Sequence, residues 1–190
     1  MIQIIRSEVL DNNALLACQA CSELVNFRST VVPGEWSFGA DDNDELKPLI
    51  LLLGRNPGRE EDSSGRPFVG RAGKVLREIV EPMHDVANFY FANMVKCWTP
   101  KDRDPSDVEI ENCAPWVQQE LKNLDVKGVV LFGRTVERVM GKVEERSVYR
   151  SIEGVVWVST YHPSFAARGN LEAKLQIGRD ISTVIRLARI

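Results

Sequence analysis

Four cysteines are the residues of this chain whose type and spacing most clearly suggest chemistry. Cys18 and Cys21 form a Cys-x-x-Cys pair, and Cys97 and Cys113 stand much later in the sequence. Because the N-terminus lacks the basic start and apolar core of a signal peptide, we expect a cytoplasmic protein, in which disulfides are disfavoured. Four thiolates suit either a tetrahedral zinc ion or a four-iron cluster, and the spacing alone does not choose between them. Redox chemistry and ordinary buried thiols are the other interpretations.

Three polar or glycine-rich loops, each following an apolar segment, hold the other candidate residues. One begins at Gly54 after the apolar residues 49–53, the next follows Val95, and the third begins at Tyr161. In a parallel sheet the carboxyl ends of the strands share one edge, so side chains far apart in sequence meet there. The pattern therefore predicts a ligand site at that edge, although loops after strands are polar in many proteins.

Strands and helices alternate along the segments that must position these loops. Apolar runs predict strands at residues 49–53, 89–95, 126–132 and 155–160. Helical spacing predicts helices at residues 11–27, 72–80, 105–121, 134–139 and 171–188, with Asp11 and Asp104 as caps, and residues 30–48 are predicted to be a loop. This alternation predicts one α/β domain over residues 1–190, with three α/β/α layers and a central, mostly parallel four-stranded sheet.

The composition limits the classes of protein that this chain can be. It has 190 residues, of which 44% are hydrophobic and 27% charged, which suits one α/β core rather than two large domains. No apolar run approaches the roughly 20 residues of a membrane span. The net charge of −3 argues against a protein that coats nucleic acid through bulk electrostatics. Acidic residues concentrate between Glu35 and Glu45, which leaves room for a basic face elsewhere.

The motifs resemble those of the iron-sulfur uracil-DNA glycosylases, family 4 of the uracil-DNA glycosylase superfamily. The matching segments stand in the family's order between positions 18 and 164: Cys18-x-x-Cys21-x-x-Leu24 with Arg28; Gly54-x-x-Pro57-Gly58-x-x-Glu61-Asp62; Gly65-Arg66-Pro67-Phe68-Val69-Gly70; Asn93-x-Val95-Lys96-Cys97 followed by Arg103-Asp104-Pro105; and Tyr161-His162-Pro163-Ser164. The resemblance implies a monomeric, monofunctional DNA glycosylase that hydrolyses the N-glycosidic bond of a flipped-out uracil. It also implies a structural [4Fe-4S] cluster on the four cysteines, with zinc as the alternative.

The same resemblance assigns three residues to the base. Phe68 would stack on the flipped base, Asn93 would hydrogen-bond its edge, and His162 would hydrogen-bond uracil O2 as negative charge develops there. A carboxamide can donate to uracil O4 and accept from N3–H, whereas cytosine offers the reverse polarity. The alternative interpretations are an ordinary core position for Phe68 and a turn-capping role for Asn93.

The segment that follows His162 is expected to contact DNA, the partner that the resemblance implies, in single- or double-stranded form. In this superfamily the corresponding loop touches phosphates and fills the gap left by the flipped base. Its residues here are Ser164, Phe165 and Arg168, and Phe165 is the expected wedge.

The chain departs from the family at Arg55 and Asn56. Family 4 has Gly-Glu-Ala/Gly-Pro-Gly where this chain has Gly54-Arg55-Asn56-Pro57-Gly58, so an arginine replaces the family's acidic residue. Asn56 instead matches the Gly-x-Asn-Pro-Gly motif of the mismatch-specific and single-strand-selective glycosylases, which implies that its carbonyl orients the attacking water. Glu61 is a second catalytic candidate, and Arg55 would contact a DNA phosphate or a substrate group that uracil lacks. Excision of hypoxanthine or a modified pyrimidine, and a catalytically silent DNA-binding protein, are the alternatives.

Overall fold

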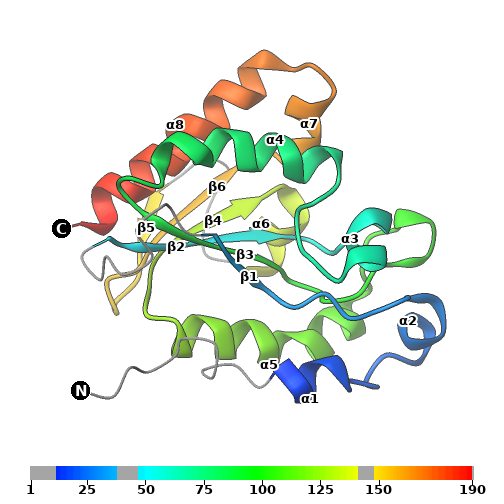
Figure 1. The fold of residues 1–190 in the computed structure, drawn as a ribbon. Coiled ribbons are helices and arrows are strands. Elements are labelled where there is room, and N and C mark those ends of the chain that lie inside the picture. Colours follow the sequence, from blue (N-terminus) through cyan, green and yellow to red (C-terminus); the bar gives the residue numbers. More distant parts are fainter. Residues whose placement is uncertain (1–11, 38–46, 141–147, 190) are drawn as a thin grey trace.

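A central sheet organises the protein, whose computed structural model describes residues 12–37, 47–140 and 148–189 (Figure 1). Within these ranges the sheet has six strands in the order β1-β3-β2-β4-β6-β5. Strands β3, β2, β4 and β6 are parallel, whereas β1 and β5 lie antiparallel at the two edges. The strand bounds are Glu35–Ser37 (β1), Leu49–Gly54 (β2), Asn88–Asn93 (β3), Val126–Phe132 (β4), Val148–Arg150 (β5) and Val156–Thr160 (β6).

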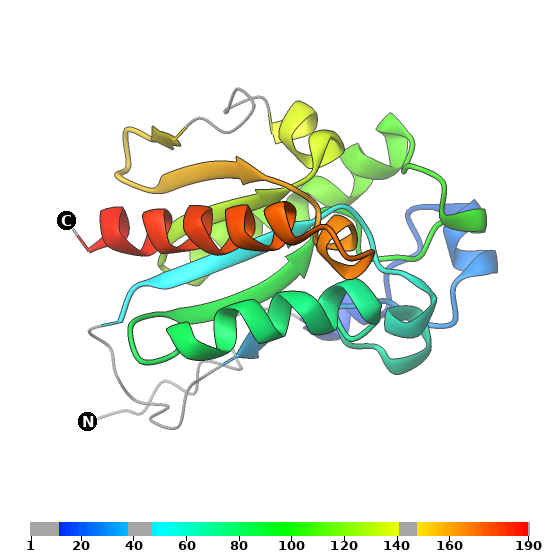
Figure 2. The same cartoon turned by 90° about the horizontal axis from the view of Figure 1, so that it is seen from above.

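Helices cover both faces of the sheet. Helices α4, α7 and α8 lie on one face and α5 lies on the other (Figures 1 and 2). In the described part of the chain, no helix is long and apolar enough to cross a membrane. The helix bounds are Asn12–Leu16 (α1), Ser22–Phe27 (α2), Arg59–Ser64 (α3), Arg71–Val80 (α4), Glu81–Met83 (η2), Pro100–Asp102 (η3), Asp107–Asn123 (α5), Arg134–Met140 (α6), Pro163–Ala167 (α7) and Leu171–Ala188 (α8).

The central strands send alternate side chains into two apolar cores. Ile50 and Leu52 pack with residues of α4 and α8 on one face, whereas Leu51 and Leu53 pack with Val117 of α5 on the other. A strand covered on both faces needs an unbroken apolar run, because successive side chains point in opposite directions. Burying each of these side chains stabilises the fold by roughly 1.5–3 kcal/mol. This two-sided packing fixes the strand ends from which the site loops leave.

The four parallel strands lie where the sequence predicts them, and the α/β/α layering is confirmed. The predicted strand number of four is too small, because β1 and β5 extend the sheet at its edges. Strand β1 lies within residues 30–48, which were predicted to be a loop. Each edge strand has three residues, none of them buried, so neither produces an apolar pattern in the sequence.

Two predicted helix boundaries are wrong. The helix predicted over residues 11–27 is divided into α1 and α2, and the break between them holds Cys18 and Cys21; the expected cap, Asp11, lies outside the described residues. Helix α5 is capped by Ser106 rather than Asp104. The Ser106 hydroxyl accepts from the Glu109 amide at 3.3 Å, and the Glu109 carboxylate accepts from the Ser106 amide at 2.7 Å. Asp104 is thereby free to pair with a residue of another loop.

Candidate active site

A cavity of about 820 Å³ lies at the carboxyl edge of the parallel strands. The loops after β2, β3, β4 and β6 all leave this edge (Figure 2). Each of them contributes residues to the lining of the cavity. The convergence expected of a parallel sheet is therefore present. Nine residues singled out in the sequence line the cavity: Arg55, Asn56, Glu61, Phe68, Asn93, His162, Ser164, Phe165 and Arg168.

Gly54 brings Phe68 and Asn93 together at the inner wall of the cavity. A Cβ atom at Gly54 would lie 2.4 Å from Asn93 Oδ1 and 2.7 Å from Phe68 Cζ, so a larger residue would displace both side chains. Asn93 is 4% exposed, and its carboxamide makes no hydrogen bond with any other residue that the structure describes. Because Asn93 also lines the cavity, this amide is available to a ligand.

Phe68 belongs both to the core and to the cavity wall. It is 7% exposed, and its ring centroid lies 5.7 Å from that of Phe91 and 6.1 Å from that of Phe132. Its φ angle of 53° is in the left-handed region, which costs a non-glycine residue about 1–2 kcal/mol. Arg77 holds this conformation by donating to the carbonyls of Phe68 and Pro67, both at 2.9 Å. The core and stacking interpretations are thus compatible, because packing fixes the orientation of the ring.

Glu61 organises the loop that carries Phe68. Its carboxylate accepts hydrogen bonds from the amides of Gly58 at 3.1 Å, Val69 at 2.9 Å and Gly70 at 2.7 Å. A Cβ atom at Gly70 would lie 3.0 Å from Glu61 Oε1, so glycine permits this close approach. Because three backbone amides donate to this carboxylate, the structure favours a structural role for Glu61 over the catalytic role considered from the sequence.

Asn56 has partners at both ends of its side-chain amide. Its Oδ1 accepts from Arg55 Nε at 2.6 Å, and its Nδ2 donates to the Pro57 carbonyl at 2.9 Å and to Thr99 Oγ1 at 3.3 Å. These contacts fix the orientation of the amide. A carbonyl oxygen has two lone pairs, so one acceptor position of Oδ1 remains for a further donor such as water.

Arg55 pairs with Asp104, which lies in the loop after β3. The guanidinium donates to the Asp104 carboxylate and, at 3.3 Å, to the Asp102 carbonyl. Thr135 Oγ1 donates to the same carboxylate at 3.1 Å. Since these contacts occupy the guanidinium, the structure gives less support to the expectation that Arg55 reads a phosphate or a substrate group.

His162 is the N-cap of α7, and its ring has a defined tautomer. Nδ1 accepts from the Ser164 amide at 3.1 Å, so the neutral ring carries its proton on Nε2. Burial, followed by the positive charges of Arg55 and Arg168, lowers the pKa of His162 to about 4. The imidazole is therefore neutral at physiological pH and can donate one hydrogen bond into the cavity.

The rim of the cavity is positively charged, although the chain carries a net charge of −3. Phe165 projects there with 45% of its surface exposed, and the Arg168 guanidinium lies 4.8 Å from its ring centroid. A rim of this kind attracts a polyanion. The cavity is lined by five arginines against three acidic residues: Arg55, Arg59, Arg71, Arg134 and Arg168, and Glu60, Glu61 and Asp102.

The four cysteines lie in one region, away from the lining of this cavity. Cys97 and Cys113 are buried, and Cys18 and Cys21 are partly exposed. Cys97 interacts electrostatically with Cys18 and Cys21, and Cys113 with Cys97 and Cys21. Among the Cys, His, Asp and Glu side chains that the structure describes, no group of three is placed to hold one metal ion.

Three hydrogen-bond donors reach the cysteine sulfurs. Arg28 donates to Cys97 Sγ at 3.0 Å, the Lys96 amide to Cys113 Sγ at 3.3 Å, and Asn112 to a third sulfur, that of Cys21, at 3.5 Å. Burial raises the pKa of the Cys97 thiol and raises that of Cys113 to about 12. The donors oppose this effect, because they stabilise negative charge on sulfur.

Comparison with known proteins decides which family has these features. The sequence model of the Uracil DNA glycosylase superfamily matches residues 41–180. The chain belongs to this superfamily. Type-4 uracil-DNA glycosylases of Sulfurisphaera tokodaii, Archaeoglobus fulgidus and Thermotoga maritima are 30%, 32% and 33% identical to it. These matches cover 92%, 79% and 80% of this chain and 81%, 78% and 78% of the relatives. The resemblance to family 4 is confirmed.

Three residues that support the site were not predicted from the sequence. Arg77 anchors the Phe68 loop, Thr99 holds the amide of Asn56, and Asp104 pairs with Arg55. Asp104 stood in a matched motif, Arg103-Asp104-Pro105, but its position before a proline suggested a helix cap instead. Thr99 and Asp104 act across loops that are distant in sequence, and Arg77 acts from α4 on the loop before it, so local spacing carries no signal for these contacts.

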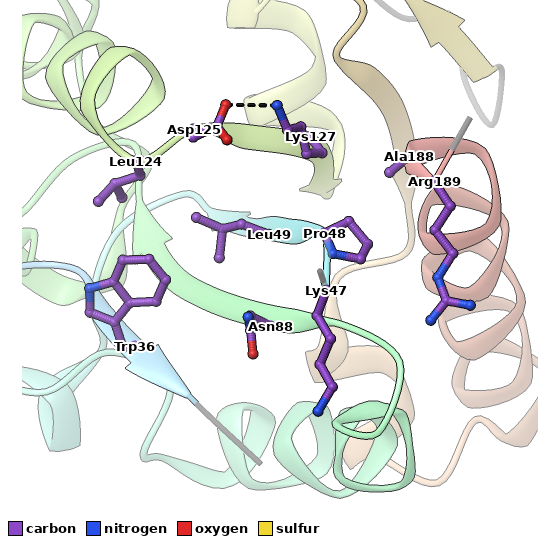
Figure 3. Close-up of a pocket in the computed structure, with 10 residues that line it drawn as sticks. All are labelled: Trp36, Lys47, Pro48, Leu49, Asn88, Leu124, Asp125, Lys127, Ala188 and Arg189. Carbon is purple, nitrogen blue, oxygen red and sulfur yellow. Dashed lines mark hydrogen bonds and ion pairs between the residues drawn. The ribbon is translucent and has the colours of Figure 1, made fainter. Parts of the chain in front are cut away.

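A second, smaller cleft of about 330 Å³ lies at the opposite edge of the sheet, where β2 and β3 begin (Figure 3). Lys127 there pairs with Asp125 at 2.8 Å. The cleft contains none of the candidate residues. Its lining comprises Trp36, Lys47, Pro48, Leu49, Asn88, Leu124, Asp125, Lys127, Ala188 and Arg189.

Proposed function

We propose that this protein is a monofunctional DNA glycosylase that hydrolyses the N-glycosidic bond of a uracil flipped out of DNA. The convergence of Phe68, Asn93 and His162 on one arginine-rimmed cavity carries this proposal. Relatives that match most of the chain are named type-4 uracil-DNA glycosylases, which supports the same activity. Membership of the family makes uracil the default base.

Asn93 and Phe68 would recognise the base. The unpaired carboxamide of Asn93 can donate to uracil O4 and accept from N3–H, whereas cytosine presents these groups with reversed polarity. The Phe68 ring offers a face on which a base can stack, a contact that is worth roughly 1–3 kcal/mol. Because Arg77 and the aromatic neighbours hold this ring in place, little conformational entropy is lost when the base enters.

His162 would stabilise the departing base. As the glycosidic bond breaks, negative charge develops on uracil O2, and a donor that strengthens with this charge lowers the barrier. The neutral imidazole provides Nε2–H for this contact, since Nδ1 already accepts from Ser164. The low pKa of His162 keeps the ring from transferring a second proton.

Asn56 would orient the attacking water. Its Oδ1 accepts from Arg55 and retains one acceptor position, to which a water can donate. An amide oxygen cannot remove a proton, which suffices when bond breaking runs ahead of attack. In this arrangement Arg55 and Asp104 are positioning residues, because they act through Asn56 rather than on the base.

The four cysteines would hold a [4Fe-4S] cluster that cross-links the segment between α1 and α2 to the loop after β3 and to α5. Four thiolates suit either a four-iron cluster or a zinc ion, and the resemblance of the cysteine set to that of family 4 favours the cluster. Bound iron would give a brown protein that absorbs at about 400 nm, and zinc would not. Replacing Cys113 by serine should lower thermal stability first and activity only as a consequence.

A glycosylase assay tests the proposed function. Purified protein with its cluster would be incubated with single- and double-stranded oligonucleotides that contain uracil, hypoxanthine or a modified pyrimidine, and alkali-labile sites would be counted. We expect cleavage at uracil. Preference for another base would redirect the substrate assignment, and no cleavage on any substrate would leave a silent DNA-binding protein.

Variants test the assigned residues. Asn56→Ala and His162→Ala should lower turnover by about 10²–10³-fold and change DNA binding little. Gln118→Ala, at an exposed position on α5, is the matched control and should be unchanged. Equal losses of turnover and binding would remove both catalytic assignments.

A further inference from the structure

Phe27 and Trp98 form an exposed aromatic pair, here called the aromatic platform. Their ring centroids lie 4.8 Å apart with the planes inclined at 47°. Phe27 ends α2 and is 39% exposed, whereas Trp98 lies in the loop after β3 and is partly exposed. The two segments, distant in sequence, lie side by side (Figures 1 and 2). Two large rings gathered at the surface present stacking area that the fold itself does not use.

The aromatic platform adjoins the cavity through two shared neighbours. The Arg59 guanidinium lies 5.9 Å from the Trp98 ring centroid, and the Trp98 indole N–H donates to the Asp102 carboxylate. Arg59 and Asp102 both line the cavity. A nucleotide next to the one in the cavity would therefore meet the aromatic platform.

The turn beside Trp98 has an unusual backbone. Lys101 and Asp102 both have a φ angle of 56°, so two successive non-glycine residues adopt the left-handed conformation. Such strain, which costs about 1–3 kcal/mol per residue, concentrates at functional sites. Here it turns the Asp102 carboxylate towards the Trp98 indole, and Lys101 of the same turn is exposed. The turn thus fixes the orientation of an aromatic ring and carries an exposed positive charge.

We propose that the aromatic platform stacks an unpaired base that flanks the flipped nucleotide, so that the enzyme acts on single-stranded or locally unpaired DNA. In a duplex a flanking base is held by its pairing partner and by its outer neighbour, and the expected wedge Phe165 fills the gap on its other side, whereas an unpaired base can turn out and stack on an aromatic side chain. Arg59 serves the same strand, because a guanidinium binds a phosphate or stacks on a base. This inference rests on the proposed function for its assumption that the substrate is DNA. It adds that the DNA around the target base is unpaired.

A cycle of paired changes in protein and DNA tests this proposal. The substrates are single-stranded oligonucleotides with one uracil, in which a tetrahydrofuran abasic residue replaces the base at each flanking position in turn. At one position, removing the base should lower kcat/KM of the wild-type protein about tenfold to a hundredfold. The same removal should cost Trp98→Ala less than about threefold, because the stacking partner is already absent.

Three further variants separate stacking from folding. Trp98→Phe keeps an aromatic ring and should retain most of the flank dependence, whereas Phe27→Leu keeps apolar volume without a ring and should lose part of it. Tyr149→Ala removes another exposed aromatic, on β5 at the sheet edge, and should leave the dependence intact. Because Trp98 follows Cys97, each variant is compared by visible absorption and thermal midpoint. Only variants that match the wild-type protein in both enter the cycle.

The same cycle can be measured as Kd with uracil-free oligonucleotides. If wild-type protein excises no base, the proposed function fails, and the binding cycle still reports on the aromatic platform. If the wild-type protein excises uracil and Trp98→Ala shows the same flank dependence at every position, the aromatic platform is refuted and the proposed function stands. A flank dependence that survives in Phe27→Leu and in Trp98→Ala alike would also refute it.

Discussion

His162 gives the sharpest test of the chemistry, because its tautomer and its charge state both follow from the structure. The Ser164 amide donates to Nδ1 at 3.1 Å, so the proton of the neutral ring lies on Nε2. If this N–H stabilises the departing base, His162→Ala should lower kcat by about 10²–10³-fold, the cost of one donor to a developing oxyanion. Single-turnover measurements with a uracil oligonucleotide give the rate without product release. His162→Gln retains an N–H donor and should recover part of the loss.

The pH profile distinguishes a neutral donor from a charged one. Burial, then Arg55 and Arg168, lower the pKa of His162 to about 4, against about 6.5 for an unperturbed histidine. The neutral fraction at pH 5 is then about nine-tenths, whereas an unperturbed ring would be mostly charged. We expect kcat to stay nearly constant from pH 7 to pH 5 and to fall near pH 4. A fall that begins at pH 6.5 on the acid side would refute the lowered pKa, and a fall on the alkaline side of pH 6.5 would refute the neutral donor.

Stability measurements give an independent check on the same group. Because the folded-state pKa of His162 lies below its unfolded-state value, the folded protein binds fewer protons between pH 6.5 and pH 4. The resulting contribution to the free energy of unfolding is fully present above pH 6.5 and is lost as the pH falls towards 4. Urea unfolding of the wild-type protein and His162→Ala should therefore differ in slope against pH only within this window. Parallel curves would contradict the shift.

Three other substitutions test the supporting contacts. Gly54→Ala should abolish most activity and lower the free energy of unfolding by about 1–3 kcal/mol, because a Cβ atom there would lie 2.4 Å from the recognition amide and 2.7 Å from the Phe68 ring; a normal kcat/KM would exclude this wall. Arg77→Met should lower the free energy of unfolding by about 1–3 kcal/mol, measured by urea unfolding, and should weaken base stacking, measured as a higher KM. Arg77→Lys should show intermediate values of both quantities. Lys96→Met leaves Glu120 buried without its 2.7 Å partner and should lower the free energy of unfolding by about 3–5 kcal/mol. Adding Glu120→Leu should restore much of this stability. No recovery in the double variant would show that the loss has another cause.

The central fold could be predicted because its causes are local. Each parallel strand is an apolar run of five to seven residues covered on both faces, and such a run is visible in the sequence. The edge strand β5 has three exposed residues and pairs with β6 on one side, so nothing in its own composition marks it. The break between α1 and α2 holds Cys18 and Cys21, and helical spacing does not register it.

The candidate site shows the same division between local and long-range causes. Asn93 and His162 stand at or just after strand ends, and Phe68 stands in a motif of the loop between α3 and α4, so their meeting at one edge follows from topology and motif together. The role of Glu61 could not be read in this way, because its carboxylate is bound by three amides, two of them beyond α3. Asp104 was also misread, since its partner Arg55 lies in a different loop. Side-chain pairing between loops depends on distances that the order of residues does not contain.

The two departures from the family 4 motif act together in this structure. Arg55 donates to Asn56 Oδ1 and so fixes the amide that replaces a small residue in the family motif. The same positive charge helps to lower the pKa of His162, whereas a glutamate at this position would favour the charged imidazole. Asp104 binds the remaining face of the guanidinium and keeps Arg55 directed towards both residues. Arg55→Glu alone should therefore raise the pKa of His162 and move the acid limb of the kcat profile to higher pH. The double variant, Arg55→Glu with Asn56→Ala, restores the family 4 motif and tests whether a carboxylate can replace the amide.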